Sequence, residues 1–261
     1  MEVTFLGTGT SHGIPVLTCN CDICRSDRPE NKRLRSSLLV RSGNSSFIVD
    51  TTPEFRIQGL RAGINSISGV FYTHTHADHL HGIDDLRPYC SKNHLPIYGS
   101  EHDINEIKSR FPYIFGEVKQ LGGGKPLIES VVLNKSLIIN DIKVTPIPIK
   151  HGILDIFGYR FNDVAYITDC SFIPQESYKL LTNLKVLIIG ALRYRPHSTH
   201  FSIDEAINEI KRINPKEAYL THICHDVEHF DLINKLEIKS KKDEFIKKIK
   251  PAHDGLCLKS V

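Results

Sequence analysis

The feature that most constrains the fold is the segment from Thr73 to Gly82, which reads THTHADHLHG and follows the apolar run VFY. Titratable groups are costly to crowd directly after a buried strand unless they serve a purpose. On a strand or its extended end, His74 and His76 point to the same side, so their imidazoles can converge on one cation. Asp78 and His79 lie just beyond, where the chain turns, and can face a second cation. The segment predicts a metal site at a strand end, where coordination positions stay open for water and substrate.

The rest of the chain alternates short apolar runs with helical patterns. Strands are expected at 2–7, 36–42, 45–50, 68–73, 95–100, 156–162, 164–169, 184–190 and 216–223, and a strand meander at 130–134, 136–140 and 142–150. Helices are expected at 53–63, 101–111, 173–183 and 202–214, the last with Ser202 and Glu205 in a capping box. Segment 112–126 is rich in Gly and Pro and is expected to be a loop excursion: a lid, a dimer contact or a flap. Two sets of strands with interspersed helices predict sheet packed on sheet with the helices outside.

Length and composition predict one globular domain spanning residues 1–261. Hydrophobic residues make up 40% of the chain, enough for a sizeable core. We find no internal repeat at a fixed short period and no linker long enough to divide the chain. No apolar run approaches the roughly 18 residues of a membrane span. The N-terminus lacks the basic start and long apolar region of a signal peptide, so we expect a cytoplasmic protein.

The charge of the chain is mild, with a formal net value of +3. Basic residues concentrate in segment 235–250, where acidic residues are interspersed. This pattern is typical of a solvated helix face rather than a nucleic-acid patch. Nucleic acid and membrane are therefore not expected partners, whereas a small anionic substrate is compatible with the charge.

Three of the seven cysteines lie together, as Cys19, Cys21 and Cys24. An odd number of cysteines, unevenly spread, argues against a disulfide framework and favours reduced thiols. Three thiolates on a tight loop are one ligand short of a closed tetrahedral zinc site. The fourth ligand must come from elsewhere in the chain, and Cys224 and His225 are both candidates.

The sequence His74-Thr75-His76-Ala77-Asp78-His79 resembles the HxHxDH motif of the metallo-β-lactamase superfamily. Three later residues, each following or ending an expected strand, stand in the order of that family's remaining ligands: His151, Asp169 and His222. The resemblance implies an αββα sandwich with a dinuclear metal site at one edge. It implies that His74, His76 and His151 hold one metal, that Asp78, His79 and His222 hold the other, and that Asp169 bridges both. Imidazole and carboxylate ligands suit several divalent ions, of which we expect zinc or manganese.

The cysteine loop is similar to that of a narrower branch, the phosphoribosyl 1,2-cyclic phosphate phosphodiesterases (PhnP-like). That resemblance implies a structural zinc bound by the three clustered cysteines and completed by a histidine three residues after the last catalytic ligand, which favours His225 over Cys224. The segment RPHSTHFSIDEA resembles the one that holds an extra active-site histidine, here His200, with His197 as second choice. An imidazole there could contact the phosphate or protonate the leaving oxygen. Arg193 and Arg195 could supply phosphate contacts.

The expected function is metal-dependent hydrolysis of a small cyclic phosphodiester, with Asp78 and His200 as catalytic residues. The resemblance implies 5-phosphoribosyl 1,2-cyclic phosphate as substrate and a homodimer as the assembly. One alternative is an RNA 3′-processing ribonuclease of the same superfamily, but no long flexible arm is visible and the charge is low for an RNA binder. A second is a non-hydrolytic metal-binding accessory protein resembling the PQQ-biosynthesis branch, but all seven expected ligands are retained, which favours catalysis.

Overall fold

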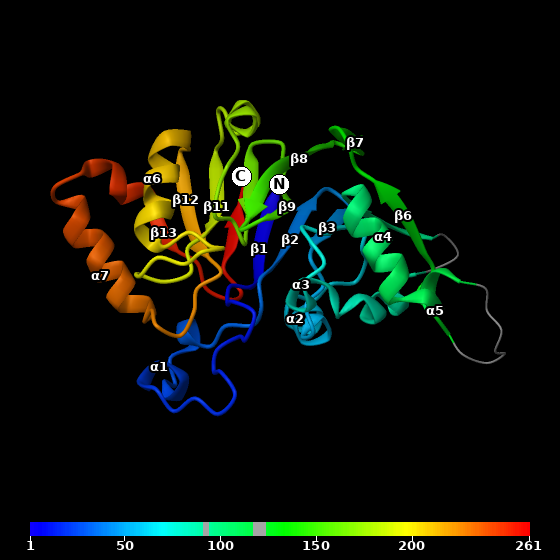
Figure 1. Cartoon of the computed structure of the whole chain (residues 1–261), viewed down its shortest axis with the longest axis horizontal. Helices are drawn as coiled ribbons and strands as arrows, with labels where there is room; N and C mark the ends of the chain where they lie inside the picture. Colours follow the sequence, from blue (N-terminus) through cyan, green and yellow to red (C-terminus); the bar gives the residue numbers. More distant parts are fainter. Residues whose placement is uncertain (91–93, 117–123) are drawn as a thin grey trace.

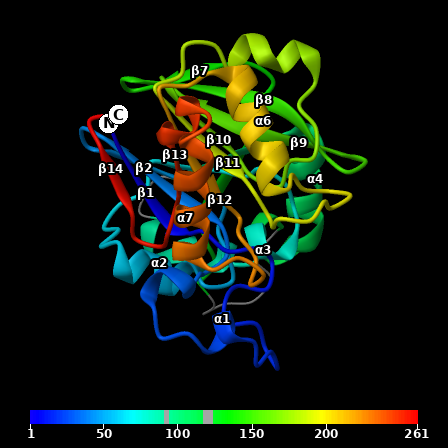
Figure 2. The same ribbon diagram turned by 90° about the vertical axis from the view of Figure 1, so that its left-hand side faces the viewer.

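The computed structural model describes residues 1–90, 94–116 and 124–261. In this part of the chain two β-sheets pack face to face and helices cover both outer faces, so the predicted αββα sandwich is confirmed (Figure 1). Two helices cover one sheet, α6 (Ile203–Ile213) and α7 (His229–Ser240). Four cover the other, α2 (Phe55–Arg61), α3 (Ala77–Leu80), α4 (Glu101–Arg110) and α5 (Pro112–Phe115). The short helix α1 (Asp22–Arg25) lies below the main body (Figure 2).

Each sheet has seven strands within the described residues. The first has the order β14 (Cys257–Lys259), β1 (Glu2–Gly7), β2 (Ser37–Ser42), β3 (Ser45–Val49), β4 (Gly69–Phe71), β5 (Leu95–Gly99) and β6 (Ile128–Val132). The second has the order β13 (Ile249–Pro251), β12 (Glu217–Thr221), β11 (Val186–Gly190), β10 (Val164–Ile167), β9 (Leu154–Phe161), β8 (Ile142–His151) and β7 (Leu137–Ile139). Strands β3 to β6 pair in parallel, as do β10 to β13, and the other neighbours pair antiparallel. Short 3₁₀ helices occur at Pro29–Asn31, Ile83–Tyr89, Gln175–Leu180 and Glu244–Lys248.

The central strands are apolar on both faces because each sheet is covered on both sides. In β11, Val186 and Ile188 pack between the sheets, whereas Leu187 and Ile189 pack against the helix layer. This alternation follows from the two-residue period of a strand. It explains why such strands are near-continuous apolar runs in the sequence rather than alternating ones.

The strand meander predicted over 130–134, 136–140 and 142–150 is wrong. Strand β6 pairs in parallel with β5 in the first sheet, whereas β7 and β8 form an antiparallel pair in the second. The chain therefore crosses from one sheet to the other between β6 and β7. Three consecutive apolar runs do not reveal this crossing, since each of them can join either sheet.

Other expected elements differ in type or length. The helix expected at 173–183 is a 3₁₀ helix over Gln175–Leu180, and the strand expected at 68–73 is only Gly69–Phe71. The expected excursion at 112–126 begins with α5, and its residues 117–123 lie outside the described part of the chain. The capping box of α6 is confirmed, with Ser202 and Glu205 bonding reciprocally. No helix among the described residues combines the length and apolarity needed to cross a membrane.

Candidate metal centre

The structure gathers side chains from both sheets at one edge of the sandwich. In the first sheet His74 follows β4, and in the second Asp169 follows β10, His222 follows β12 and His151 ends β8. The rings of His74 and His151 are 5.5 Å apart, and His79 Nε2 lies 3.4 Å from Asp169 Oδ1. The carboxyl ends of parallel strands are a common place for ligands in α/β folds. The three later residues therefore meet the Thr73–Gly82 segment, as the sequence predicted.

The first group consists of His74, His76 and His151, whose ligand atoms all lie within 4.8 Å of one another. His74 Nε2 is 3.0 Å from His76 Nδ1. Two nitrogens bound to one tetrahedral zinc at the usual bond lengths lie roughly 3.3 Å apart. His151 Nδ1 donates to the carbonyl oxygen of Thr199 at 2.8 Å, which leaves the lone pair on Nε2. His76 is exposed, so this group opens to solvent.

The second group consists of His74, His79 and Asp169, whose ligand atoms lie within 4.8 Å of one another, and Asp78 and His222 border it. His79 Nε2 lies 3.1 Å from Asp78 Oδ2, and His222 Nδ1 lies 3.0 Å from Asp169 Oδ1. The Nε2 atoms of His79 and His222 are buried and make no hydrogen bond among the described residues, although carboxylate oxygens of Asp78 and Asp169 lie close to His79 Nε2. Buried polar atoms in native proteins nearly always have a partner. Two buried nitrogens that make no hydrogen bond thus lie beside two carboxylates, and this set of donors fits a bound divalent cation.

The electrostatics of the second group favour a cation. Burial alone would lower the pKa of His79, but the carboxylates of Asp169, Asp78 and Asp50 outweigh it and raise that pKa well above its ordinary value. Burial would raise the pKa of Asp169, but His222 and His79 hold it well below its usual range. A nearby opposite charge stabilises the ionised form of each group. The fold therefore places ionised carboxylates around a buried point that can accept positive charge.

The sequence interpretation missed Asp50, which follows β3. Its carboxylate accepts hydrogen bonds from the backbone N–H and hydroxyl of Thr73 and lies 2.7 Å from His79 Nδ1. This contact sets the tautomer of His79 so that Nε2 faces the candidate metals.

Asp50 is fully buried and has a positive φ of 64°. Asp169 and His222 share this left-handed backbone, which non-glycine residues rarely adopt and which clusters at functional sites. The run SSFIVD ends in aspartate after a strand, as YITD does, and this signal could have identified Asp50.

We expect Asp50→Asn to weaken metal binding and activity about 10- to 100-fold, the usual cost of losing an outer hydrogen-bond partner of a metal ligand. The amide cannot accept from Thr73 and His79 as the carboxylate does. Metal content after dialysis against graded chelator measures the effect. Asp103→Asn is the matched control, since Asp103 is also buried but contacts Ser100. Equal metal loss in both variants would contradict a positioning role for Asp50.

His200 lies beside the candidate metal ligands. Its ring is 4.6 Å from that of His151 and 4.9 Å from that of His222, and its Nδ1 is 4.0 Å from Asp169 Oδ2. Burial, followed by the charge of His222, lowers the pKa of His200 to about 3, so its imidazole is neutral at physiological pH. His151, Asp169 and His200 also form a group whose ligand atoms lie within 4.8 Å of one another. The ring of His197 lies 5.2 Å from that of His200.

The cysteine loop forms a separate cluster with His225. His225 Nδ1 is 3.3 Å from Cys19 Sγ, 3.6 Å from Cys21 Sγ and 3.5 Å from Cys24 Sγ. Nitrogen and sulfur bound to one tetrahedral zinc lie roughly 3.5 Å apart by their usual bond lengths, so the four side chains fit that ion. Cys224 Sγ instead accepts from the backbone N–H of Asp226, so His225 is the residue that faces the three thiols.

Two thiols of this cluster differ in acidity. The backbone N–H of Cys24 donates to Cys21 Sγ and lowers the pKa of Cys21 to about 6. Burial raises the pKa of Cys24 to about 11. A coordinating metal deprotonates thiols outright, and a closed four-ligand set is typical of a structural rather than a catalytic zinc.

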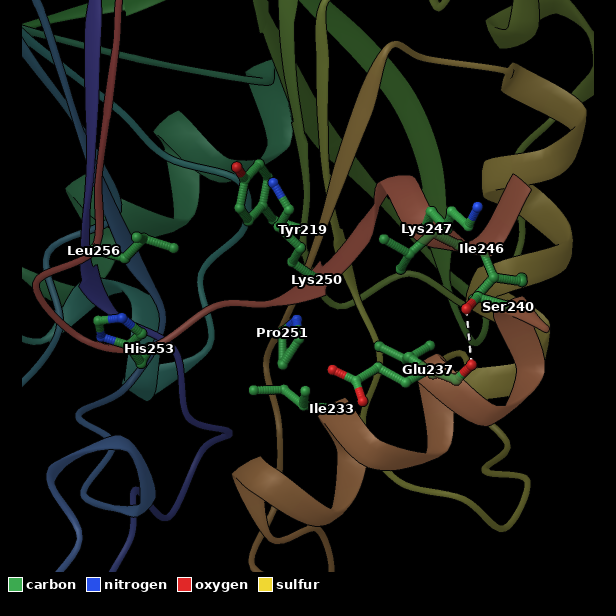
Figure 3. Close-up of a pocket in the computed structure, with 12 residues that line it drawn as sticks. Tyr219, Ile233, Glu237, Ser240, Ile246, Lys247, Lys250, Pro251, His253 and Leu256 are labelled. Carbon is green, nitrogen blue, oxygen red and sulfur yellow. Dashed lines mark hydrogen bonds between the residues drawn. The ribbon is translucent and has the colours of Figure 1, made fainter. Parts of the chain in front are cut away.

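A cavity of about 520 Å³ lies away from both clusters, beside α7 and β13 (Figure 3). Its walls are mostly apolar, with Ile233, Ile246 and Pro251 among them. Lys247, Lys250 and His253 also line the cavity. None of the candidate metal ligands lines this cavity, so it does not contribute to the candidate site.

Comparisons with known proteins agree with this geometry. The sequence model described as "Beta-lactamase superfamily domain" matches residues 46–223. A solved structure described as a new diphosphatase from the PhnP family is 36% identical, with a TM-score of 0.89 over 100% of this chain and 98% of that one.

Two curated relatives are longer than this chain. A Porphyromonas gingivalis (strain ATCC BAA-308 / W83) protein named octanoyltransferase is 36% identical over 241 residues, which are 89% of this chain and 49% of that protein. Ribonuclease Z of Prochlorococcus marinus (strain MIT 9515) is 28% identical over 207 residues, which are 69% of this chain and 58% of that protein. The chain thus spans about half the length of the curated relatives it matches.

Proposed function

Because this chain belongs to the metallo-β-lactamase superfamily, in its PhnP-like branch of metal-dependent phosphodiester hydrolases, we propose that it hydrolyses a small cyclic phosphodiester at a pair of divalent metal ions. The observation that carries the proposal is the convergence of imidazoles and carboxylates at one edge of the sandwich, where buried ring nitrogens make no hydrogen bond within the described residues. 5-Phosphoribosyl 1,2-cyclic phosphate is the proposed substrate. We also propose that residues 1–261 form one hydrolase domain and that the enzyme is a homodimer.

In the proposed site His74, His76 and His151 would hold one ion, Asp78, His79 and His222 would hold the second, and Asp169 would contribute to both. Zinc or manganese fits this set of nitrogen and oxygen donors. Bound there, the two ions would supply acidified water and offset negative charge on the phosphate oxygens. The cysteine cluster with His225 holds the proposed structural zinc.

The residues around the ions would orient the ligand imidazoles and protonate the leaving group. Thr199 fixes the ring of His151 through its carbonyl oxygen, and Asp50 fixes that of His79. These contacts hold the ligand imidazoles in place before substrate binds, which lowers the reorganisation needed in the transition state. His200 is neutral without substrate, and the negative charge of a bound phosphate would raise its pKa, so that the ring takes up a proton from solvent and gives it to the oxygen that leaves phosphorus.

We expect His200→Ala to lower kcat about 10²- to 10⁴-fold on a cyclic alkyl phosphodiester, the usual range for a general acid. An alkoxide is a poor leaving group and needs a proton as the P–O bond breaks. Bis(p-nitrophenyl) phosphate releases a phenolate that departs without one, so its hydrolysis should fall much less. Steady-state kinetics with both esters measure the difference. An equal loss on both substrates would assign His200 to phosphate contact instead.

The function itself is tested with purified protein loaded with zinc or manganese. We expect 5-phosphoribosyl 1,2-cyclic phosphate to open to a ribose bisphosphate, detected by ³¹P NMR, and bis(p-nitrophenyl) phosphate to be cleaved more slowly. The proposal fails if metal-loaded protein leaves both compounds intact.

RNA 3′ processing is the second candidate, favoured by the similarity to ribonuclease Z. The net charge of +3 is low for a protein that binds RNA through many phosphate contacts. Salt-sensitive binding and 3′ cleavage of precursor transfer RNA would support this alternative. The name octanoyltransferase adds no candidate activity, because half of that protein lies outside the match.

A further inference from the structure

A cavity of about 400 Å³ lies between the candidate metal centre and the cysteine cluster. His200 and His197 line it on the side of the metal centre, and His225 lines it on the side of the cysteine cluster. His200 also contacts the metal-ligand group, since its ring is 4.6 Å from that of His151. His200 therefore lies between this cavity and the candidate metal ligands. Its volume falls within the range of about 300 to 1,000 Å³ typical of small-molecule sites.

Two arginines line this cavity, and they differ in their partners. Arg195 Nη2 lies 2.9 Å from Asp226 Oδ2, so its charge is paired. Arg193 donates only to backbone carbonyl oxygens, from Nε to Arg195 at 3.4 Å and from Nη2 to Pro196 at 3.2 Å. Within residues 1–90, 94–116 and 124–261, no carboxylate oxygen lies within 4.0 Å of its guanidinium. The backbone holds the Arg193 guanidinium at the cavity while its charge lacks an anionic partner.

Resting on the proposed function, we infer that this cavity binds a second anionic group of the substrate and that Arg193 is the residue that selects it. On the proposed substrate this anionic group is the 5-phosphate of the ribose. A guanidinium matches phosphate oxygens in a bidentate manner and keeps its charge at any physiological pH. The scissile phosphate lies at the metals and the second phosphate lies beyond His200, next to Arg193.

The test compares two substrates that differ only in the remote phosphate: 5-phosphoribosyl 1,2-cyclic phosphate and ribose 1,2-cyclic phosphate. For the wild type, the phosphorylated compound should have a KM at least about tenfold lower, as expected for charge-assisted hydrogen bonds. Arg193→Gln should raise that KM about tenfold and change kcat little, because the lost contact is made equally in ground and transition states. Neither parameter should change for ribose 1,2-cyclic phosphate.

Two further variants make the test specific. Arg193→Lys keeps the charge and should recover part of the affinity. Arg195→Gln is the matched control, since it removes an arginine of the same cavity that is already paired, and it should change KM by less than the Arg193 variant. Equal KM values of the wild type for both substrates, or equal effects of the two glutamine variants, would overturn the inference.

A binding measurement separates this inference from the proposed function. Ribose 5-phosphate is the probe, titrated calorimetrically into the metal-loaded enzyme. Its Kd should rise about tenfold in Arg193→Gln and stay within about twofold in Arg195→Gln. If the Kd is unchanged in Arg193→Gln while bis(p-nitrophenyl) phosphate is still cleaved, the second phosphate site is contradicted and the proposed phosphodiesterase function is not. Loss of all phosphodiester cleavage by the wild type would sink the proposed function instead.

Discussion

Asp78→Ala is expected to abolish catalysis while the protein still folds. The side chain of Asp78 lies 3.1 Å from His79 Nε2 and belongs to none of the three apolar clusters of the core. Its loss removes a proposed ligand of the second ion rather than a packing contact. Metal ions contribute several kcal/mol to transition-state stabilisation, so hydrolysis should fall about a thousandfold or more.

The measurements are steady-state hydrolysis and metal analysis of the same preparation. The wild type should hold roughly three metal ions per chain, two catalytic and one structural, and the variant roughly one fewer. Asp204→Ala is the control, because Asp204 pairs with Lys239 on the surface. Undiminished hydrolysis with unchanged metal content in Asp78→Ala would contradict the assignment of Asp78 as a ligand.

Cys21→Ala is expected to damage stability before it damages chemistry. The three thiols and His225 tie the loop around α1 to the segment after β12, and a metal bound there would contribute to folding directly. Because the chain also has a large apolar core, we expect the loss to be on the order of 3 kcal/mol, or roughly 10 °C in Tm. Cleavage by protease within the loop should become rapid.

Thermal unfolding, limited proteolysis and zinc content together test this prediction. Cys257→Ala is the matched control, since Cys257 is also half-buried but lies on β14, outside the cluster. An unchanged melting temperature and full zinc content in Cys21→Ala would contradict a structural zinc at this site. Loss of stability in both variants to the same extent would point to general packing damage.

The candidate metal centre was predictable because its ligands carry local signals. His74 to His79 are contiguous, and His151, Asp169 and His222 each end or follow a strand, so topology alone brings them to one edge. Asp50 was missed because an aspartate after a strand is common, and its role depends on the position of His79 in another loop. The sequence alone left Cys224 and His225 both open, since neighbouring residues point to different sides of a loop.

The parts of the fold that the sequence did not predict depend on long-range pairing. The apolar pattern of β6 is compatible with either sheet, and only its register beside β5 assigns it to the first. The difference between Arg193 and Arg195 is likewise invisible in the sequence, because it arises from the position of Asp226. Side chains that differ only in their partners need coordinates to be told apart.

The first and last strands of the described chain lie side by side and run in opposite directions. In β1 and β14, Glu2 faces Lys259, at the end of the sheet where β2 turns into β3. The candidate metal centre occupies the opposite end, where Asp50 leaves β3. An affinity tag or a fused partner attached at either terminus would therefore project away from the mouth of the active site. A circular permutant could close the two termini with a short linker and leave the catalytic edge unobstructed.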